Sequence, residues 1–182
     1  MKSLLILGIG NPIRGDDGVG IAAAARLRDR IACEAADIGE TSEGGFALLS
    51  LISGYEAVIM VDAIRTREGR PGDVHRFSRE DLGCLQTVEV THNAGIPAVL
   101  TWAEHMGIPL PTRMIVYAIE IEGGDTFCEG LSHEVENAIP RVVALIEKDI
   151  DAMLSQPGRG SLFKPYVKEG KQWRFKHLMR AV

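Results

Sequence analysis

The sequence predicts an α/β fold, a three-layer α/β/α sandwich on a twisted, mostly parallel sheet. Two apolar runs, Leu4–Ile9 and Ala57–Val61, carry no charge and are too short for core helices, which is typical of strands buried on both faces. Segments with helical spacing of apolar residues alternate with the strand-like runs, an order that requires right-handed crossovers between parallel strands. The 182 residues suffice for one domain with a substantial core.

The other elements are expected in order along the chain. Ser132 is a suitable N-cap for the long last helix, in which Pro140 should produce a kink or a local opening. The first strand is expected to lie between the second and the third. The carboxyl ends of the first and third strands would then flank a crevice of the kind in which ligands bind. Further helices are expected at 19–31, 46–53 and 94–106, and further strands at 31–38, 73–77, 88–91 and within 113–122.

Carboxylates follow both apolar strands. Asn11-Pro12 breaks regular structure, and Asp16 and Asp17 then precede an alanine-rich helix, while Asp62 follows the other strand directly. The expected topology brings Asp17 and Asp62 face to face across the crevice. Two other interpretations compete. Asp16 can simply cap the helix, and Gly8-Ile9-Gly10 begins a dinucleotide-binding fingerprint, although its third glycine would fall at Ile13.

His92 is the histidine placed best for chemistry, because it lies where an extended segment meets a helix. Together with Asp17 and Asp62 it offers two carboxylates and one imidazole, a plausible set of three ligands for a borderline divalent ion such as nickel, zinc or copper. Serine and metallopeptidase signatures of the G-x-S-x-G and H-E-x-x-H types are absent from the sequence. Glu120 and Glu122 are expected to be solvated residues at the rim of the sheet.

Composition predicts an ordinary globular body, residues 1–156, followed by a basic extension, residues 157–182. The extension has seven Lys/Arg against one acidic residue, interleaved with four aromatic residues, while the whole chain has a net charge of −5. Such interleaving occurs in single-stranded nucleic-acid and membrane-surface binders, but packing on the acidic domain, or ordering by a partner, is the favoured explanation. Three isolated cysteines, Cys33, Cys84 and Cys128, predict reduced thiols in the cytoplasm. No apolar stretch of the sequence has membrane-spanning length.

Three segments together resemble the motifs of the nickel–iron hydrogenase maturation endopeptidases. Gly8–Asn11 with Gly15–Gly20 looks like the family's opening motif, Val61–Ala63 like its second and Thr91–Asn93 like its third. The resemblance runs in the right order over residues 3–155. It implies a mixed sheet of about five strands, one of them antiparallel, in a phosphorylase/hydrolase-like sandwich.

The resemblance also implies an activity. Members of this family remove a C-terminal peptide from a hydrogenase large-subunit precursor after nickel insertion, and the nickel held by the precursor is the recognition element. Asp17, Asp62 and His92 occupy the positions of the family's metal ligands, with Asp17 where many relatives have Glu. An uncoordinated carboxylate such as Asp16 is the candidate general base.

The alternative from another class is a non-catalytic nickel-binding chaperone or adaptor for hydrogenase assembly. A general peptidase is a third possibility, but it needs more metal ligands than the sequence offers. The resemblance predicts neither a nucleic-acid partner nor membrane insertion. It assigns no cofactor other than nickel, which the substrate would supply.

Overall fold

The computed structural model describes residues 2–31, 36–82, 96–123 and 127–155. Within these residues there are five strands, five α-helices and one 3-10 helix. In chain order the elements are β1 (Lys2–Ile9), η1 (Gly15–Gly18), α1 (Val19–Arg28), β2 (Asp37–Thr41), α2 (Ala47–Ile52), β3 (Tyr55–Ile64), β4 (Val74–Ser78), α3 (Arg79–Leu82), α4 (Ile96–His105), β5 (Arg113–Glu120) and α5 (His133–Ser155).

The five strands form one mixed sheet in the order β2-β1-β3-β5-β4. β1 pairs in parallel with β2 and β3, β3 pairs in parallel with β5, and β4 pairs with β5 in the antiparallel direction. The predicted arrangement of the first three strands is therefore confirmed, as is the single antiparallel strand. The chain reverses its direction of winding at the β1/β3 junction, which makes the carboxyl ends of these two strands the topological switch point.

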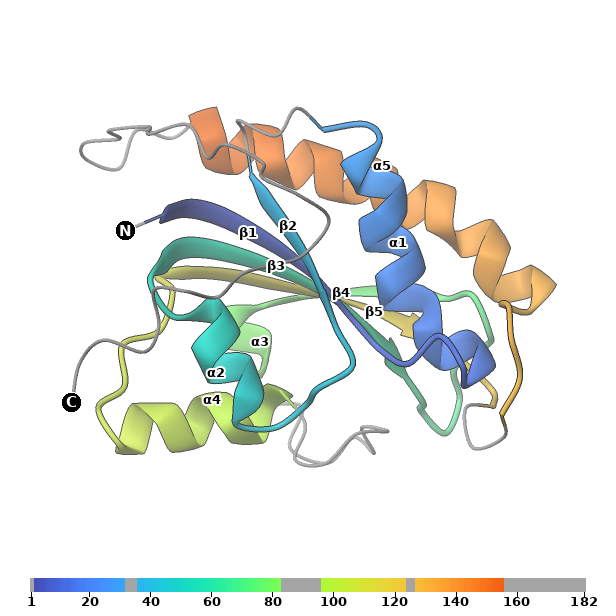
Figure 1. Ribbon diagram of the computed structural model, residues 1–182, viewed down its shortest axis with the longest axis horizontal. Coiled ribbons are helices and arrows are strands. Elements are labelled where there is room, and N and C mark those ends of the chain that lie inside the picture. The colour runs from blue at the N-terminus through green and yellow to red at the C-terminus, as the bar shows by residue number, and fades with distance from the viewer. Residues whose placement is uncertain (1, 32–35, 83–95, 124–126, 156–182) are drawn as a thin grey trace.

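Two helical layers cover the sheet, as Figure 1 shows, with α1 and α5 on one side and α2, α3 and α4 on the other. Alternation along the strands divides the core accordingly: Ile59 and Val61 pack with α1 and α5, whereas Val58 and Met60 pack with α2 and α4. Both faces of β3 are buried because apolar residues occupy every position from Ala57 to Val61. This is the α/β/α sandwich that the sequence predicts.

Several boundaries differ from the sequence-based expectation. β2 begins at Asp37, instead of lying within 31–38, because an edge strand bonded only to β1 needs no continuous apolar run. β3 continues two residues past Asp62, so this residue lies inside the strand. Pro140 is exposed within a helix assigned without interruption from His133 to Ser155. The strand expected at 88–91 lies outside the described residues.

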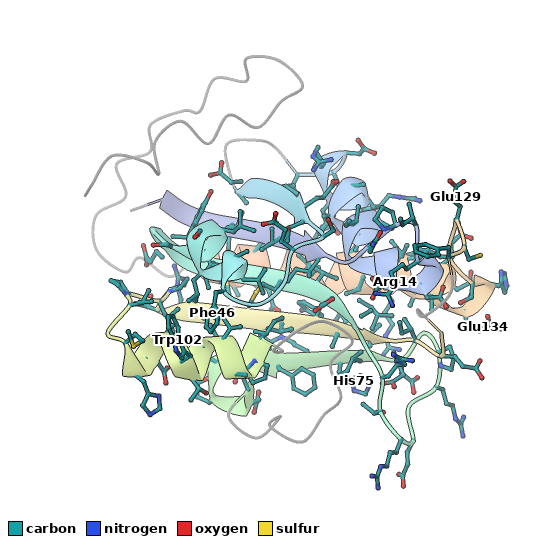
Figure 2. All side chains as sticks on the ribbon, turned by 60° about the horizontal axis from the view of Figure 1, so that its bottom comes forward. Arg14, Phe46, His75, Trp102, Glu129 and Glu134 are labelled. Atoms are coloured by element: carbon teal, nitrogen blue, oxygen red, sulfur yellow. The ribbon has the colours of Figure 1, made fainter. Side chains whose placement is uncertain are left out.

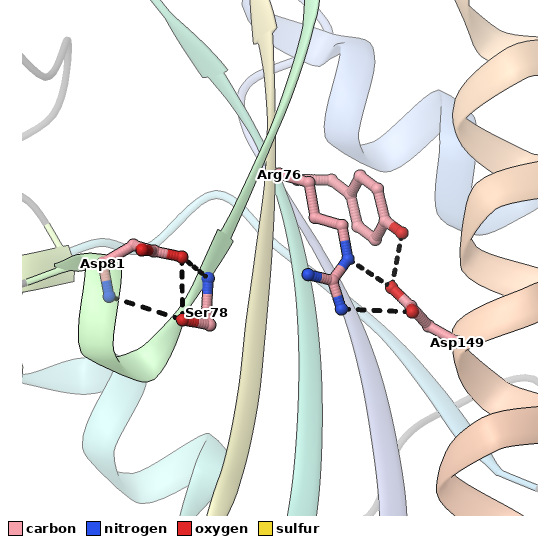
Figure 3. Close-up of polar contacts among 5 residues, drawn as sticks. Arg76, Ser78, Asp81 and Asp149 are labelled. Atoms are coloured by element: carbon pink, nitrogen blue, oxygen red, sulfur yellow. Dashed lines mark hydrogen bonds and ion pairs between the residues drawn. The ribbon is translucent and has the colours of Figure 1, made fainter.

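A polar network joins the edge of the sheet to α5, as shown in Figure 3. The guanidinium of Arg76 donates two hydrogen bonds to Asp149, at 2.8 and 3.1 Å, and the hydroxyl of Tyr117 donates to the same carboxylate at 2.5 Å. Burial, and then the bond to Asp149, raises the pKa of Tyr117 above its ordinary value. This contact fixes α5 against β4 and β5.

A second polar contact, drawn in Figure 3, caps the N-terminus of α3. Ser78 and Asp81 form a reciprocal cap, in which the Asp81 carboxylate accepts from the Ser78 backbone N–H at 2.8 Å and the Ser78 Oγ accepts from the Asp81 N–H at 3.4 Å. The backbone hydrogen bond from Ser78 is the main reason that the pKa of Asp81 is lowered. The cap turns the chain sharply from β4 into α3.

Candidate functional site

The turn after β1 carries the first two predicted site residues. Asn11 organises it: its side-chain Oδ1 accepts from the Ile13 N–H at 3.2 Å, and its carbonyl accepts from the Arg14 N–H at 3.0 Å. Asp16 and Asp17 then lie in the 3-10 helix η1, one short element before α1. They therefore precede the alanine-rich helix, as expected.

Asp17 and Asp62 are both buried, with 0% and 5% of their surfaces exposed. One oxygen of each accepts a backbone hydrogen bond, Asp17 Oδ2 from the Asn11 N–H at 3.0 Å and Asp62 Oδ1 from the Ala63 N–H at 2.8 Å. Carboxylate oxygens are hard donors, and a carboxylate offers about four lone-pair sites in total. The donor chemistry of the pair thus fits a divalent ion.

The packing of α1 brings η1 to the end of β3. A side chain at Gly20 would collide with the carbonyl oxygens of Ile9 and Val61, so only glycine lets the first turn of α1 rest directly on the ends of both strands. η1 accordingly contacts β3. Asp17 and Asp62 therefore occupy the same edge of the sheet, on elements that touch, as the predicted topology requires.

Asp16 has a different partner from the one expected of a helix cap. Its Oδ1 accepts a hydrogen bond from the Ser132 N–H at 2.6 Å, immediately before α5, and neither η1 nor α1 has a side-chain cap. The interpretation of Asp16 as the cap of the first helix is thus wrong. Ser132 does precede α5 as predicted, but its Oγ makes no hydrogen bond within the described part of the chain.

The third predicted ligand, His92, lies outside the described residues, so its place in the site remains a prediction. Among the residues that are described, no group of three or more His, Cys, Asp or Glu side chains is arranged to hold a metal ion. The thiol of Cys128 is free and exposed, whereas Cys33 and Cys84 also lie outside the described segments.

Glu120 differs from the sequence-based prediction. It was expected to be solvated, but it is only 1% exposed at the end of β5, whereas Glu122 is exposed as expected. Its carboxylate accepts from the backbone N–H of Thr66 and lies 3.2 Å from Nε2 of His75. The available signal was its position at the carboxyl end of β5, the edge of a parallel sheet at which ligands bind.

No helix in the described segments has the length and apolar character that crossing a membrane requires.

Comparisons with known proteins identify the family of this chain. A family model described as "Hydrogenase maturation protease" matches residues 23–149, a stretch that contains Asp62 and His92. Among curated proteins, the hydrogenase 2 maturation protease of Escherichia coli K12 is 25% identical over 154 residues, which cover 84% of this chain and 88% of the relative. A putative hydrogenase maturation protease of Methanocaldococcus jannaschii is 27% identical over 160 residues, covering 82% and 97%.

Solved structures of hydrogenase maturation proteases share the fold of this chain. The hydrogenase maturating endopeptidase HybD from E. coli superposes with a TM-score of 0.73 at 23% identity, over 84% of this chain and 93% of that one. HybD from Thermococcus kodakarensis, a [NiFe] hydrogenase maturation protease, gives a TM-score of 0.62 at 26% identity, over 82% and 99%. The family model covers more than half of the chain, and this chain therefore belongs to the hydrogenase maturation protease family, whose members are peptide hydrolases.

Proposed function

We propose that this protein removes a C-terminal peptide from the large-subunit precursor of a [NiFe] hydrogenase once nickel has been inserted into that precursor. Beyond family membership, one observation carries the proposal: Asp17 and Asp62 are buried carboxylates on contacting elements at the switch point of the sheet. Carboxylate oxygens in a poorly solvated position attract a divalent cation more strongly than exposed ones do, because the local dielectric is low.

Nickel is part of the substrate in this proposal. Asp17, Asp62 and His92 complete the coordination shell of an ion that the precursor already holds, and an imidazole beside two carboxylates is a donor set that suits nickel. A precursor without nickel offers the site no ion to hold and binds more weakly. Specificity is thus a difference in affinity between the loaded and the empty precursor.

The chemistry is the hydrolysis of one peptide bond. The substrate's nickel polarises the scissile carbonyl or lowers the pKa of a water bound to it. Asp16 is the residue that the sequence suggests as general base, and its bond to the Ser132 N–H occupies one carboxylate oxygen. We expect this protein to act in the cytoplasm, as the three isolated cysteines of the sequence suggest.

The test uses the purified full-length protein with its cognate precursor, prepared with and without nickel, and follows the intact mass of the precursor. We expect loss of a C-terminal peptide from the nickel-loaded form alone. Asp17→Ala, Asp62→Ala and His92→Ala should each abolish this loss. Asp151→Ala, at an exposed position on α5, is the matched control and should cleave at the wild-type rate.

Other results would contradict the proposal in different ways. Stable binding of the loaded precursor without any change in mass would indicate the nickel-binding chaperone or adaptor instead of a peptidase. Cleavage of loaded and empty precursor at the same rate would show that nickel is not the recognition element. Full activity of the Asp17→Ala and Asp62→Ala variants would remove both residues from the site.

A further inference from the structure

Glu120 lies buried at the carboxyl end of β5, where the loop between β3 and β4 closes over it. A side chain at Gly69 would run into the Glu120 carboxylate, so this glycine lets the loop backbone pass directly over the acid. The N–H of Thr66, four residues after Asp62, donates to Glu120 Oε1. The carboxylate is therefore covered and hydrogen-bonded by the same loop that follows Asp62.

His75, which lies on β4 and is labelled in Figure 2, is the side-chain partner of this acid. Its Nε2 lies 3.2 Å from Glu120 Oε2, and 36% of its side chain is exposed, against 1% for that of Glu120. A carboxylate bonded to one ring nitrogen of a histidine fixes the orientation of the ring and its tautomer. A buried acid that orients a partly exposed imidazole is the arrangement found in general acid–base catalysis.

Strand register places His75 and Asp62 in one row, on either side of Ala118. Ala118 pairs with Asp62 on one side and with His75 on the other, so the three residues form a row across β3, β5 and β4. Their side chains share the face of the sheet to which Val58 and Met60 belong. Two strand spacings separate the Cα atoms of Asp62 and His75 by roughly 9 to 10 Å.

The middle residue of this row has the smallest side chain. Ala118 carries only a methyl group and separates the longer side chains of Asp62 and His75. His75 thus stands outside the expected coordination sphere of the nickel, but close enough to act on a water or an amide group beside the ion. Glu120 lies two residues after Ala118 on β5, and its carboxylate contacts the ring of His75 from there.

We propose that His75, oriented by Glu120, is the residue that transfers protons during peptide hydrolysis, an inference that rests on the proposed function. His75 takes a proton from the attacking water, and the oxygen of that water forms a bond to the scissile carbonyl carbon. When the C–N bond breaks, the histidine returns the proton to the leaving nitrogen. The products are a carboxyl terminus and a free amine, and the histidine regains its starting state.

This role distinguishes His75 from Asp16. The Asp16 carboxylate accepts the backbone N–H of Ser132 and so helps to hold two segments together. His75 has one nitrogen directed to a carboxylate and, within the described segments, no hydrogen bond other than that to Glu120. Substitutions at the two positions therefore give different kinetic results.

The experiment measures kcat and KM for cleavage of the nickel-loaded precursor by the full-length protein. His75→Ala should lower kcat by roughly 10² to 10⁴-fold with little change in KM, and added imidazole should restore part of the rate. Glu120→Gln should lower kcat less and leave KM unchanged. The matched controls are His105→Ala, an exposed histidine on α4, and Glu122→Gln, an exposed neighbour of Glu120, both expected to behave as wild type.

Each outcome decides the inference. A wild-type kcat in His75→Ala would overturn the inference and leave the proposed function intact. The same holds if the folded His75→Ala variant loses activity and added imidazole fails to restore it. If Asp16→Asn abolished cleavage while His75→Ala did not, Asp16 would be the base. If the wild-type protein failed to cleave loaded precursor, the proposed function itself would be wrong, and the role of His75 would fall with it.

Discussion

The carboxylate of Asp16 accepts a hydrogen bond from the backbone N–H of Ser132 at 2.6 Å, although 116 positions separate the two residues in the chain. The bond connects the turn that carries Asp17 to the start of α5. It therefore holds one candidate ligand in place relative to the longest helix of the domain.

Asp16→Ala should destabilise the fold, because the partly buried N–H of Ser132 then loses its acceptor. The expected loss is about 1 kcal/mol in the free energy of unfolding. Asp16→Asn keeps an oxygen at this place and should cost much less. Urea unfolding of both variants measures the difference, and equal stability of the alanine variant and the wild type would show that the bond contributes nothing.

Gly20→Ala should destabilise the protein, although alanine normally stabilises a helix by about 1 kcal/mol relative to glycine. The added methyl group would collide with the carbonyl oxygens of Ile9 and Val61, and relieving that contact costs roughly 1 to 3 kcal/mol. Gly123→Ala is the control, since nothing lies within 4 Å of its added carbon. A rise in the thermal midpoint of Gly20→Ala would contradict the close packing of α1 on the sheet.

Tyr117 should make the fold less stable at high pH. Its folded-state pKa is raised above the ordinary value of 10.0, chiefly by burial. Its stabilising contribution is thus complete below about pH 10 and is lost as the pH rises toward the raised pKa, where the unfolded chain ionises first. Tyr117→Phe should flatten the fall in unfolding free energy above pH 10, and chemical denaturation from pH 8 to 11 tests this. An unchanged slope would assign the alkaline loss to other groups.

Excess Ni²⁺ should stabilise the wild-type protein even without precursor, if Asp17 and Asp62 bind the ion. At a free concentration about 100 times the dissociation constant, the expected gain is about 2.7 kcal/mol. The Asp17→Ala/Asp62→Ala double variant should show none of it. Calorimetric melting with and without Ni²⁺ makes the comparison, and an equal gain in both proteins would place the ion elsewhere.

Sequence reasoning recovered the centre of the sheet because Leu4–Ile9 and Ala57–Val61 are buried on both faces and therefore read as uninterrupted apolar runs. It misplaced β2 because Asp37–Thr41 forms a sheet edge, where only one neighbour constrains the residue types. The alternation of residues along a strand shows which side chains share a face of the sheet. It does not show which other segment of the chain packs on that face.

The candidate site shows the same division. The switch point and its carboxylates, Asp17 and Asp62, follow from local pattern and topology alone. The partners of Asp16 and Glu120 do not, because Ser132 and Thr66 are remote in sequence and contribute backbone N–H groups that every residue type possesses. The place of His92 remains a prediction.

The bond between Asp16 and Ser132 has a consequence for the order of biosynthesis. The ribosome makes the acidic turn among the first residues of the chain, but the segment that secures it is made only with the start of α5. A nascent chain therefore carries Asp16 and Asp17 long before Ser132 can bind to this turn, at a stage when β3 still lacks its neighbour β5. The turn that carries Asp17 thus reaches its final set of contacts only after the start of α5 has been synthesised.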